Sequence, residues 1–247
     1  MRISCVCPTH GRAHVIGEAV ESFRRQTYTG EMEMLILNDC PEQPLSCDVP
    51  GVRIINLPEP IPDASLKFNR AVEEADGDLI AWWEDDDISL PRRLEYSERL
   101  WKTGLHDDLQ YVKVKKAFIW KDQRIESHCK NLFFGASLFS REYYLEKGGA
   151  VQGDWPDLSA HNAMADGCYE FDVIPELTWF VYKWGGPVHH DSGAGIQDGA
   201  TRFKQFRERT LSHPRFRPGP QHIIPAWRRD YVAEVRKWIA ADKEAGR

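Results

Sequence analysis

The first ninety residues alternate between short apolar runs and amphipathic segments, and this order restricts the fold more than any other feature of the chain. The runs are strand-sized, whereas the amphipathic segments carry apolar side chains at helical spacing. The expected strands are Ile3–Cys7, Met32–Leu37, Val52–Leu57 and Leu79–Trp83, and the expected helices are Val15–Gln26 and Leu66–Glu74. Strands that alternate with helices predict βαβ units, and therefore an α/β fold with a mostly parallel sheet flanked by helices.

The rest of the chain indicates mixed strands and short helices. The expected strands lie within Gln110–Trp120, Leu132–Phe139 and Leu177–Trp184, and the expected helices are Arg141–Lys147, Pro156–Ala165 and the amphipathic Trp227–Ile239. No internal repeat or low-complexity linker interrupts the chain. The simplest organisation is a single domain followed by a basic C-terminal extension.

Charge divides the chain into an acidic body and a basic tail. The 247 residues have a net charge of −6, but residues 201–247 carry +7 and residues 1–200 carry −13. The tail interleaves arginine and lysine with phenylalanine, for example in Arg215–Arg217. Such a segment can grip a phosphate backbone, pair with the acidic body, close over a diphosphate or contact anionic lipid.

Several protein classes are not expected. No apolar run approaches the roughly 20 residues that a membrane helix needs, and the N-terminus lacks the pattern of a signal peptide. The six cysteines form no C-x-x-C pair, so a zinc or redox site is not expected, and Cys5 and Cys7 are interpreted as buried core residues. These features favour a cytoplasmic protein with reduced thiols.

Polar residues follow three of the expected parallel strands at the point where each strand ends. Thr9–Arg12 follows the first strand, Asn38–Asp39 the second, and Asp85–Asp87 the strand that begins at Leu79. In sheets of this kind, ligands bind beyond the carboxyl ends of the strands. The three clusters are therefore expected to meet at one binding site.

The acidic run suggests a divalent cation. Three adjacent carboxylates repel one another unless a cation lies among them, and oxygen ligands suit Mg²⁺ or Mn²⁺. In an extended segment Asp85 and Asp87 project to the same side. The alternatives are a solvated acidic loop and a cap for the helix that follows Pro91.

Five segments in the expected order resemble the motifs of family-2 glycosyltransferases with the GT-A fold. The segments are Val6–Arg12, Leu35–Asp39, Asn69–Asp78, Trp83–Glu95 and Ser137–Gly149. The resemblance covers roughly residues 3–195. It implies a GT-A (Rossmann-like) domain over residues 1–200, with a nucleotide-binding half at 1–95 and an acceptor half at 96–200. Residues 201–247 would form a basic helical extension.

The resemblance also implies ligands for the metal. Asp87 corresponds to the last aspartate of D-x-D and is the first expected ligand. Asp85 is the second, through the metal, its water or the ribose, whereas Asp86 is expected to point away from the ion within the same nucleotide-binding loop. His190 fits the family's closing loop and can complete the site, with His189 as the alternate.

The nucleotide contacts are carried over in the same way. Pro8, Thr9 and Arg12 would line the nucleotide, although Arg12 can also be a surface charge. Asp39 would bind the base or the ribose, and its alternative role is that of a turn residue. Lys67 would reach the ribose or a phosphate, and its alternative is a solvated helix lysine.

The catalytic base is expected at the start of a helix after the acceptor segment. Asp157 and Asp154 both qualify, and Asp157 is preferred because Asp154 can instead cap that helix. Trp155 can stack on a sugar ring or only pack. The implied reaction is an inverting, metal-dependent transfer of one sugar from a nucleotide-sugar donor, with a UDP-sugar as the default, to an acceptor hydroxyl. A processive synthase is not expected, because the chain has no Gln-x-x-Arg-Trp motif and no membrane span.

Other functions stay open at this point. The same chemistry could act on a hydroxylated base in DNA, but the acidic body favours a glycan or small-molecule acceptor. A sugar-nucleotide nucleotidyltransferase would need a glycine-rich basic loop after the first strand, where Pro8–Arg12 holds only Gly11. A non-catalytic nucleotide- or glycan-binding module is the third alternative. Peripheral membrane contact through the tail is a minor one.

Overall fold

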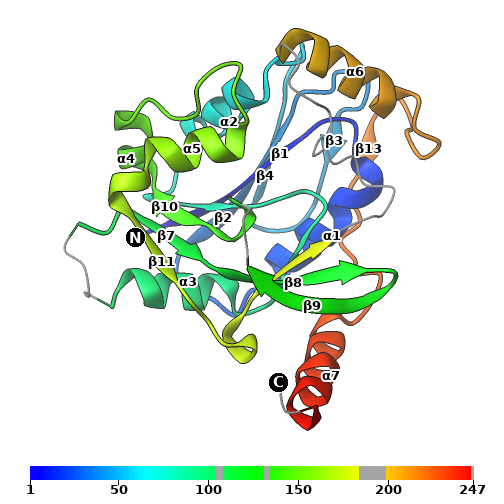
Figure 1. Ribbon diagram of the computed structural model, residues 1–247. Helices are drawn as coiled ribbons and strands as arrows, with labels where there is room; N and C mark the ends of the chain where they lie inside the picture. The colour runs from blue at the N-terminus through cyan, green and yellow to red at the C-terminus, as the bar shows by residue number, and fades with distance from the viewer. Residues whose placement is uncertain (104–107, 131–133, 184–198, 246–247) are drawn as a thin grey trace.

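A computed structural model describes residues 1–103, 108–130, 134–183 and 199–245. A seven-stranded, mostly parallel mixed sheet in the order β11-β7-β10-β5-β1-β2-β4 forms the centre of the molecule (Figure 1). Its strands are β1 (Ile3–Thr9), β2 (Met32–Asn38), β4 (Val52–Asn56), β5 (Leu79–Trp82), β7 (Tyr111–Val114), β10 (Leu138–Ser140) and β11 (Cys168–Phe171). β1, β2, β4 and β5 are parallel, and β10 runs antiparallel to β5 and β7. The predicted α/β fold is confirmed.

Two smaller sheets accompany the large one among the described residues. The first has the order β6-β12-β8-β9, and the second pairs β3 with β13. Their strands are β3 (Leu45–Ser46), β6 (Ile88–Ser89), β8 (Lys116–Lys121), β9 (Arg124–Lys130), β12 (Phe180–Lys183) and β13 (Gln221–His222). The pairing of β13 with β3 ties the C-terminal extension to the domain.

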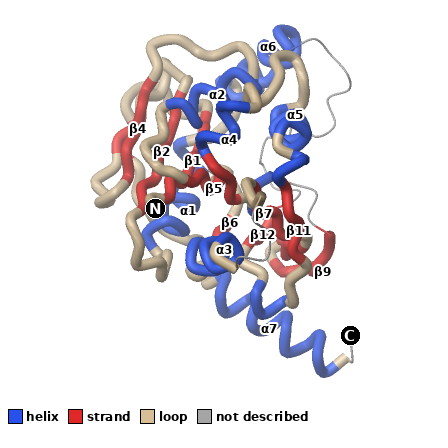
Figure 2. Tube along the Cα trace, turned by 90° about the vertical axis from the view of Figure 1, so that its left-hand side faces the viewer, coloured by secondary structure: helices blue, strands red, loops and turns tan. Residues whose placement is uncertain are grey.

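In the described part of the chain, seven α-helices surround the sheets. They are α1 (Ala13–Arg24), α2 (Ala64–Glu73), α3 (Arg93–Trp101), α4 (Arg141–Glu146), α5 (Pro156–Ala163), α6 (Gly199–Leu211) and α7 (Tyr231–Glu244), with short 3-10 turns at Phe134–Ala136, Ala165–Gly167 and Pro175–Leu177. In both views α6 lies at one end of the molecule and α7 at the other (Figures 1 and 2). Among the described residues, no helix is both long and apolar enough to cross a membrane.

Alternation along the buried strands produces a core on each face of the large sheet. Cys5 and Cys7 of β1 pack in the cluster that includes α1, whereas Val6 packs in the cluster that includes α2. Both cysteines are fully buried, as predicted. A third cluster joins the β8–β9–β12 sheet to α7 through Tyr231 and Val235. The apolar face of α7 is therefore packed on the protein.

Some predicted elements are shifted or were not predicted. The C-terminal helix begins at Tyr231, because Asp230 caps it by accepting a hydrogen bond from the N–H of Ala233, so Trp227 precedes the helix. α3 was expected only in one alternative, as a helix that follows Pro91, and β9 and β11 were not predicted. α3 and β9 are rich in charge, and the half-buried β9 also lacks the alternation of a core strand. The expected strand at Leu177 begins only at Phe180, after a 3-10 turn.

Candidate functional site

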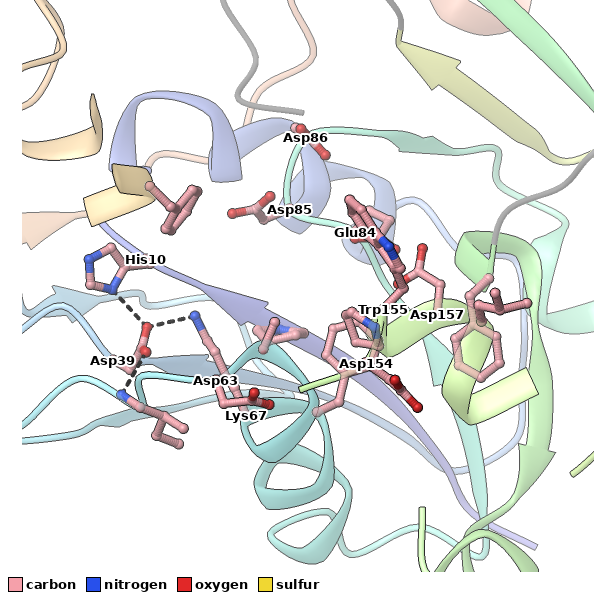
Figure 3. Close-up of a pocket in the computed structure, with 18 of the residues that line it drawn as sticks. His10, Asp39, Asp63, Lys67, Glu84, Asp85, Asp86, Asp154, Trp155 and Asp157 are labelled. Atoms are coloured by element: carbon pink, nitrogen blue, oxygen red, sulfur yellow. Dashed lines mark hydrogen bonds and ion pairs between the residues drawn. The ribbon is translucent and has the colours of Figure 1, made fainter. Parts of the chain in front are cut away.

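The polar ends of β1, β2 and β5 meet beside one cavity of about 740 Å³. The strand register causes this, since Thr9 lies opposite Asn38 and Val6 lies opposite Trp82. Three residues beyond Trp82, the chain places Asp85 against Thr9, whose hydroxyl donates a hydrogen bond of 2.6 Å to that carboxylate. All the site residues expected before residue 184 except Thr9 line the cavity: Pro8, Arg12, Asp39, Lys67, Asp85, Asp86, Asp87, Asp154 and Asp157 (Figure 3).

The acidic run is buried. Asp85, Asp86 and Asp87 expose 3%, 5% and 4% of their surface, so the alternative of a solvated acidic loop is wrong. The Arg12 guanidinium donates to Asp85 at 2.9 Å and also pairs with Asp86. It is therefore no simple surface charge. Asp87 accepts a hydrogen bond of 2.7 Å from the backbone N–H of Lys183 on β12.

Burial and mutual repulsion disfavour the ionised form of these carboxyl groups unless further positive charge is present. Burial raises the pKa of Asp85 despite Arg12, and burial together with the charge of Asp86 raises the pKa of Asp87 well above its usual range. Buried carboxylate oxygens are the donors that Mg²⁺ and Mn²⁺ prefer. The chemistry of Asp85 and Asp87 therefore fits a divalent cation. In the described part of the chain, no three His, Cys, Asp or Glu residues form a complete metal site. His189 and His190 lie outside the described residues.

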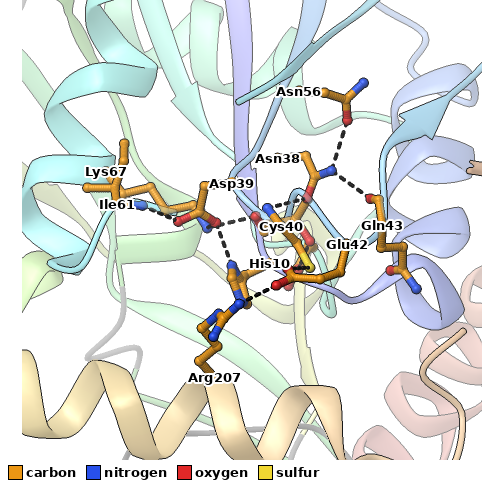
Figure 4. Close-up of polar contacts among 12 residues, drawn as sticks. His10, Asn38, Asp39, Cys40, Glu42, Gln43, Asn56, Ile61, Lys67 and Arg207 are labelled. Atoms are coloured by element: carbon orange, nitrogen blue, oxygen red, sulfur yellow. Dashed lines mark hydrogen bonds and ion pairs between the residues drawn. The ribbon is translucent and has the colours of Figure 1, made fainter. Parts of the chain in front are cut away.

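Asp39 connects the ends of β1 and β2. Its Oδ1 accepts hydrogen bonds from His10 Nδ1 at 2.9 Å and from Lys67 Nζ at 2.6 Å, and its Oδ2 accepts from the N–H of Ile61 at 3.0 Å (Figure 4). Lys67 also donates to the carbonyl of Thr9 at 2.7 Å, so the alternative of a solvated lysine is wrong. Burial alone would raise the pKa of Asp39, but Lys67 and His10 hold it well below its ordinary value.

Asp157 lies in the first turn of α5 and faces the same cavity as the acidic run (Figure 3). Burial raises its pKa from 3.8 to about 6. The neighbouring Glu84, which accepts a hydrogen bond from Trp82 Nε1 at 2.9 Å, has its pKa raised by burial and by the charge of Asp157. A carboxylate with a pKa close to neutrality is suited to take a proton in catalysis.

Asp154 occupies a different environment from Asp157. It is exposed, and the residue at the N-cap of α5 is Trp155, so the alternative of Asp154 as the cap is wrong. Trp155 is 40% exposed and Leu158 is 58% exposed, and both line the mouth of the cavity. This loop therefore presents apolar surface and two carboxylates at the entrance.

The basic extension covers another part of the cavity. Phe203 and Phe206 of α6 line it, and their rings lie 5.9 and 5.6 Å from that of His10. Arg207 forms an ion pair with Glu42, which follows β2 (Figure 4). Arg207 of the basic tail therefore pairs with the acidic body, which is one of the roles expected for the tail.

A tight turn between β1 and α1 allows α6 to lie close to the end of β1. Gly11 has a φ of +64°, and a Cβ at this position would lie 2.6 Å from the side chain of Thr210 on the segment that covers it. A larger residue would clash with α6 and would also be strained in this left-handed conformation.

Several contributors to the cavity were not identified from the sequence, and they include His10, Glu84, Phe203 and Phe206. His10 lies within the Pro8–Arg12 segment, so its position was a usable signal. Glu84 precedes the acidic run and was grouped with it only as a charge. The α6 phenylalanines are some 120 residues from the acidic run, and no local pattern connects the two.

Comparison with solved structures shows the fold shared with GT-A glycosyltransferases. S. aureus TarS 1-349 in complex with UDP-GlcNAc aligns with a TM-score of 0.59 at 10% identity, over 88% of this chain and 68% of that chain. A further structure of TarS 1-349 aligns with a TM-score of 0.56 at 12% identity, over 74% of this chain and 60% of that chain. The mannosyltransferase PcManGT from Pyrobaculum calidifontis, in complex with GDP-Man and Mn²⁺, aligns with a TM-score of 0.50 at 14% identity, over 73% and 56% of the two chains.

The chain spans 44% of TarS in another structure of that protein. None of the curated proteins matches its sequence. The sequence model for "Glycosyl transferase family 2" matches residues 4–166, which is more than half of the chain and includes the acidic run and Asp157. The chain therefore belongs to glycosyl transferase family 2, whose members transfer a sugar from a nucleotide-sugar donor.

Proposed function

We propose that this protein is an inverting, metal-dependent hexosyltransferase that moves one sugar from a nucleotide-sugar to an acceptor hydroxyl. One observation carries the proposal: a single cavity holds the buried run Asp85–Asp87 and, facing it, Asp157 with a raised pKa. The first group suits a leaving diphosphate with its cation, and the second suits an acceptor hydroxyl. Both halves of a glycosyl transfer are thus supplied by residues of this chain.

Asp87 and Asp85 would hold the cation, with Mn²⁺ or Mg²⁺ as the candidates, and His190 or His189 would add a ligand. When bound, such a cation neutralises charge on the diphosphate leaving group. Arg12 and Lys67 add fixed positive charge along the same wall, where Arg12 pairs with Asp85 and Lys67 pairs with Asp39. Pro8 and Thr9 would lie along the nucleotide.

Asp157 would act as the general base. Its carboxylate would take the proton from the acceptor hydroxyl while the hydroxyl oxygen attacks the anomeric carbon. The bond from that carbon to the diphosphate oxygen breaks on the opposite side, so the configuration inverts and the electron pair leaves with the diphosphate. Asp154 is the second candidate, and its exposure places it nearer the entrance.

The donor is proposed to be a UDP-sugar. Two structural neighbours are solved with UDP-GlcNAc and with GDP-Man, so both nucleotides belong in the test. For the acceptor we favour a glycan or small molecule over nucleic acid, because exposed Trp155 offers a flat apolar surface at the mouth of an acidic cavity. A cytoplasmic location and peripheral contact with membranes stay proposals from the sequence.

A binding panel tests the donor half. UDP, GDP, CDP and ADP are titrated by calorimetry with and without Mn²⁺, on the parent protein, on Asp87→Asn and on Asp48→Asn, whose side chain is 95% exposed. We expect one diphosphate to bind tightly only when Mn²⁺ is present. Of the two variants, only Asp87→Asn should lose the affinity that Mn²⁺ adds. Tight binding that ignores the metal would refute the metal-dependent mechanism, and no binding of any diphosphate would refute the transferase.

A rate measurement tests the base. Release of the nucleotide from UDP-GlcNAc and GDP-Man in the presence of Mn²⁺ is followed for the parent, Asp157→Asn and Asp154→Asn. We expect Asp157→Asn alone to lose turnover while keeping its affinity for the diphosphate. Full activity in Asp157→Asn would remove this residue from the mechanism.

A further inference from the structure

One face of α2 holds the loop that leads into α5. Asn69 binds both backbone groups of Ala150, since its Nδ2 donates to the carbonyl and its Oδ1 accepts from the N–H, each at 2.9 Å. Four residues earlier on the helix, the fully buried Ser65 donates from its hydroxyl to the carbonyl of Asp154 at 3.2 Å. Each of these bonds goes to loop backbone, so α2 defines the path of the loop.

Asp63, at the start of α2, makes the third connection. It is only 7% exposed, and it lines the cavity (Figure 3). Its Oδ1 accepts from the N–H of Leu66 at 3.1 Å and so caps the helix, while its Oδ2 accepts from the N–H of Gly153 at 2.9 Å. One buried carboxylate thus begins α2 and holds the loop at the residue before Asp154.

The loop conformation at this point depends on the contact. Gly153 has a φ of +87°, a left-handed conformation that glycine adopts without strain, and a Cβ there would meet no atom within 4 Å. Its hydrogen bond to Asp63 ties this left-handed residue to the start of α2, and so restrains the direction in which the chain enters α5.

The same helix also reaches the nucleotide end of the cavity. Lys67, four residues after Asp63, donates to Asp39 at 2.6 Å and to the carbonyl of Thr9 at 2.7 Å. α2 is therefore bonded to the ends of β1 and β2 through Lys67 and to the loop before Asp157 through its other polar residues. A single rigid element links the two halves of the site.

We infer that Asp63 is a positioning residue for sugar transfer, which holds the Gly153 loop so that Asp157 and Trp155 face the donor end of the cavity. The inference rests on the proposed function in one respect, the role of Asp157. The chemistry of Asp63 differs from that of a base, because both of its oxygens already accept N–H bonds. Its effect on the reaction is exerted through the loop.

The test separates the cap from the loop contact. Asp63→Ser keeps a good capping residue for α2, but the shorter side chain cannot also reach Gly153. Asp230→Ser is the matched control, because Asp230 caps α7 in the same way, accepting from the N–H of Ala233 at 3.0 Å. α7 lies at the opposite end of the molecule from α6, which lines the cavity (Figure 1). Both variants are compared with the parent by hydrogen exchange and by turnover of UDP-GlcNAc or GDP-Man with Mn²⁺.

We expect the amides of residues 150–155 to exchange faster in Asp63→Ser, by roughly ten- to a hundred-fold for the loss of a hydrogen bond to a charged acceptor. Turnover should fall by about ten- to a hundred-fold with the donor KM unchanged, because the misplaced group acts on the acceptor side. Asp230→Ser should change neither. Restoring the carboxylate one carbon further away, in Asp63→Glu, should recover part of the turnover.

The possible failures are distinguishable. Unchanged exchange at residues 150–155 in Asp63→Ser would overturn the claim that Asp63 holds the loop, whatever the effect on turnover. Faster exchange with unchanged turnover would overturn the positioning role and leave the proposed function intact. If the parent releases neither nucleotide, the proposed function fails, and the catalytic part of this inference fails with it.

Discussion

Replacing Asp157 with asparagine should make the protein more stable while removing its activity. Burial raises the pKa of this carboxyl from 3.8 to about 6, so the folded state binds its proton more tightly than the unfolded state does. The charged carboxylate therefore lowers the free energy of unfolding. Below pH 3.8 the group is protonated in both states and has no effect, and as the pH rises toward 6 the free energy of unfolding falls. Above pH 6 the full penalty is present.

The size of the effect follows from the shift. A change of one pKa unit corresponds to about 1.4 kcal/mol, so a rise from 3.8 to about 6 corresponds to at most about 3 kcal/mol at neutral pH. Asparagine keeps the shape of the side chain and cannot ionise. We therefore expect a gain of about 1–3 kcal/mol in Asp157→Asn at pH 7.5. The gain should also include relief of Glu84, whose pKa the charge of Asp157 raises.

Urea denaturation followed by circular dichroism measures the free energy of unfolding of the parent and of Asp157→Asn at pH 7.5 and at pH 4. A chelator is present so that no bound cation offsets the repulsion among the carboxylates. The exposed Asp154→Asn is the control. The gain should be present at pH 7.5, nearly absent at pH 4, and absent from the control. Parent turnover should fall as the pH drops below about 6, because the base must be unprotonated. A variant that is equally stable at pH 7.5, or that gains as much at pH 4, would refute the reasoning.

Three further outcomes are expected. Lys67→Met should destabilise the fold by about 1–3 kcal/mol in urea, because Asp39 loses a buried partner. The control Lys102→Met, at an exposed helical ion pair, should change stability by less than about 0.5 kcal/mol. Equal effects of the two variants would contradict the burial of the Lys67–Asp39 pair. Glu42→Gln should weaken the contact of α6 with the domain, because it removes the ion pair with Arg207, and a maleimide should then label the buried Cys40 thiol faster. Unchanged labelling, measured by peptide mass spectrometry, would contradict the assignment that α6 covers this part of the protein. Mn²⁺ and UDP together should raise the melting temperature by more than the sum of their separate effects, and simple additivity would contradict a shared site.

The strands that position the site were predictable because burial imposes a local pattern. β1, β2 and β5 are mostly apolar and almost entirely buried, as strands covered on both faces must be. β1 and β2 end at a polar residue, and the acidic run follows β5. Their parallel order follows from the helices between them. The convergence of Thr9, Asp39 and Asp85 at one edge was thus contained in the order of the elements.

Arg93 shows why the packing of α3 was not predicted. It is completely buried, donates to Ser89 Oγ at 2.6 Å and stacks over the ring of Trp83 at 4.4 Å. An arginine reads as a surface residue in any local pattern, because its charge is usually solvated. Only the carbonyl, hydroxyl and ring that surround it in the folded chain make its burial acceptable.

By itself, the sequence determined the α/β architecture, the place of the acidic run after β5 and the family, because these depend on neighbours a few residues apart. The tertiary structure alone decided that Lys67 and His10 share Asp39, that α6 covers the cavity and that Asp63 holds the loop before Asp157. Those contacts join residues that lie from 28 positions apart, for Lys67 and Asp39, to 196 positions apart, for His10 and Phe206. Long-range partners of this kind are selected by packing of the whole chain, and they leave no periodic signal in the sequence.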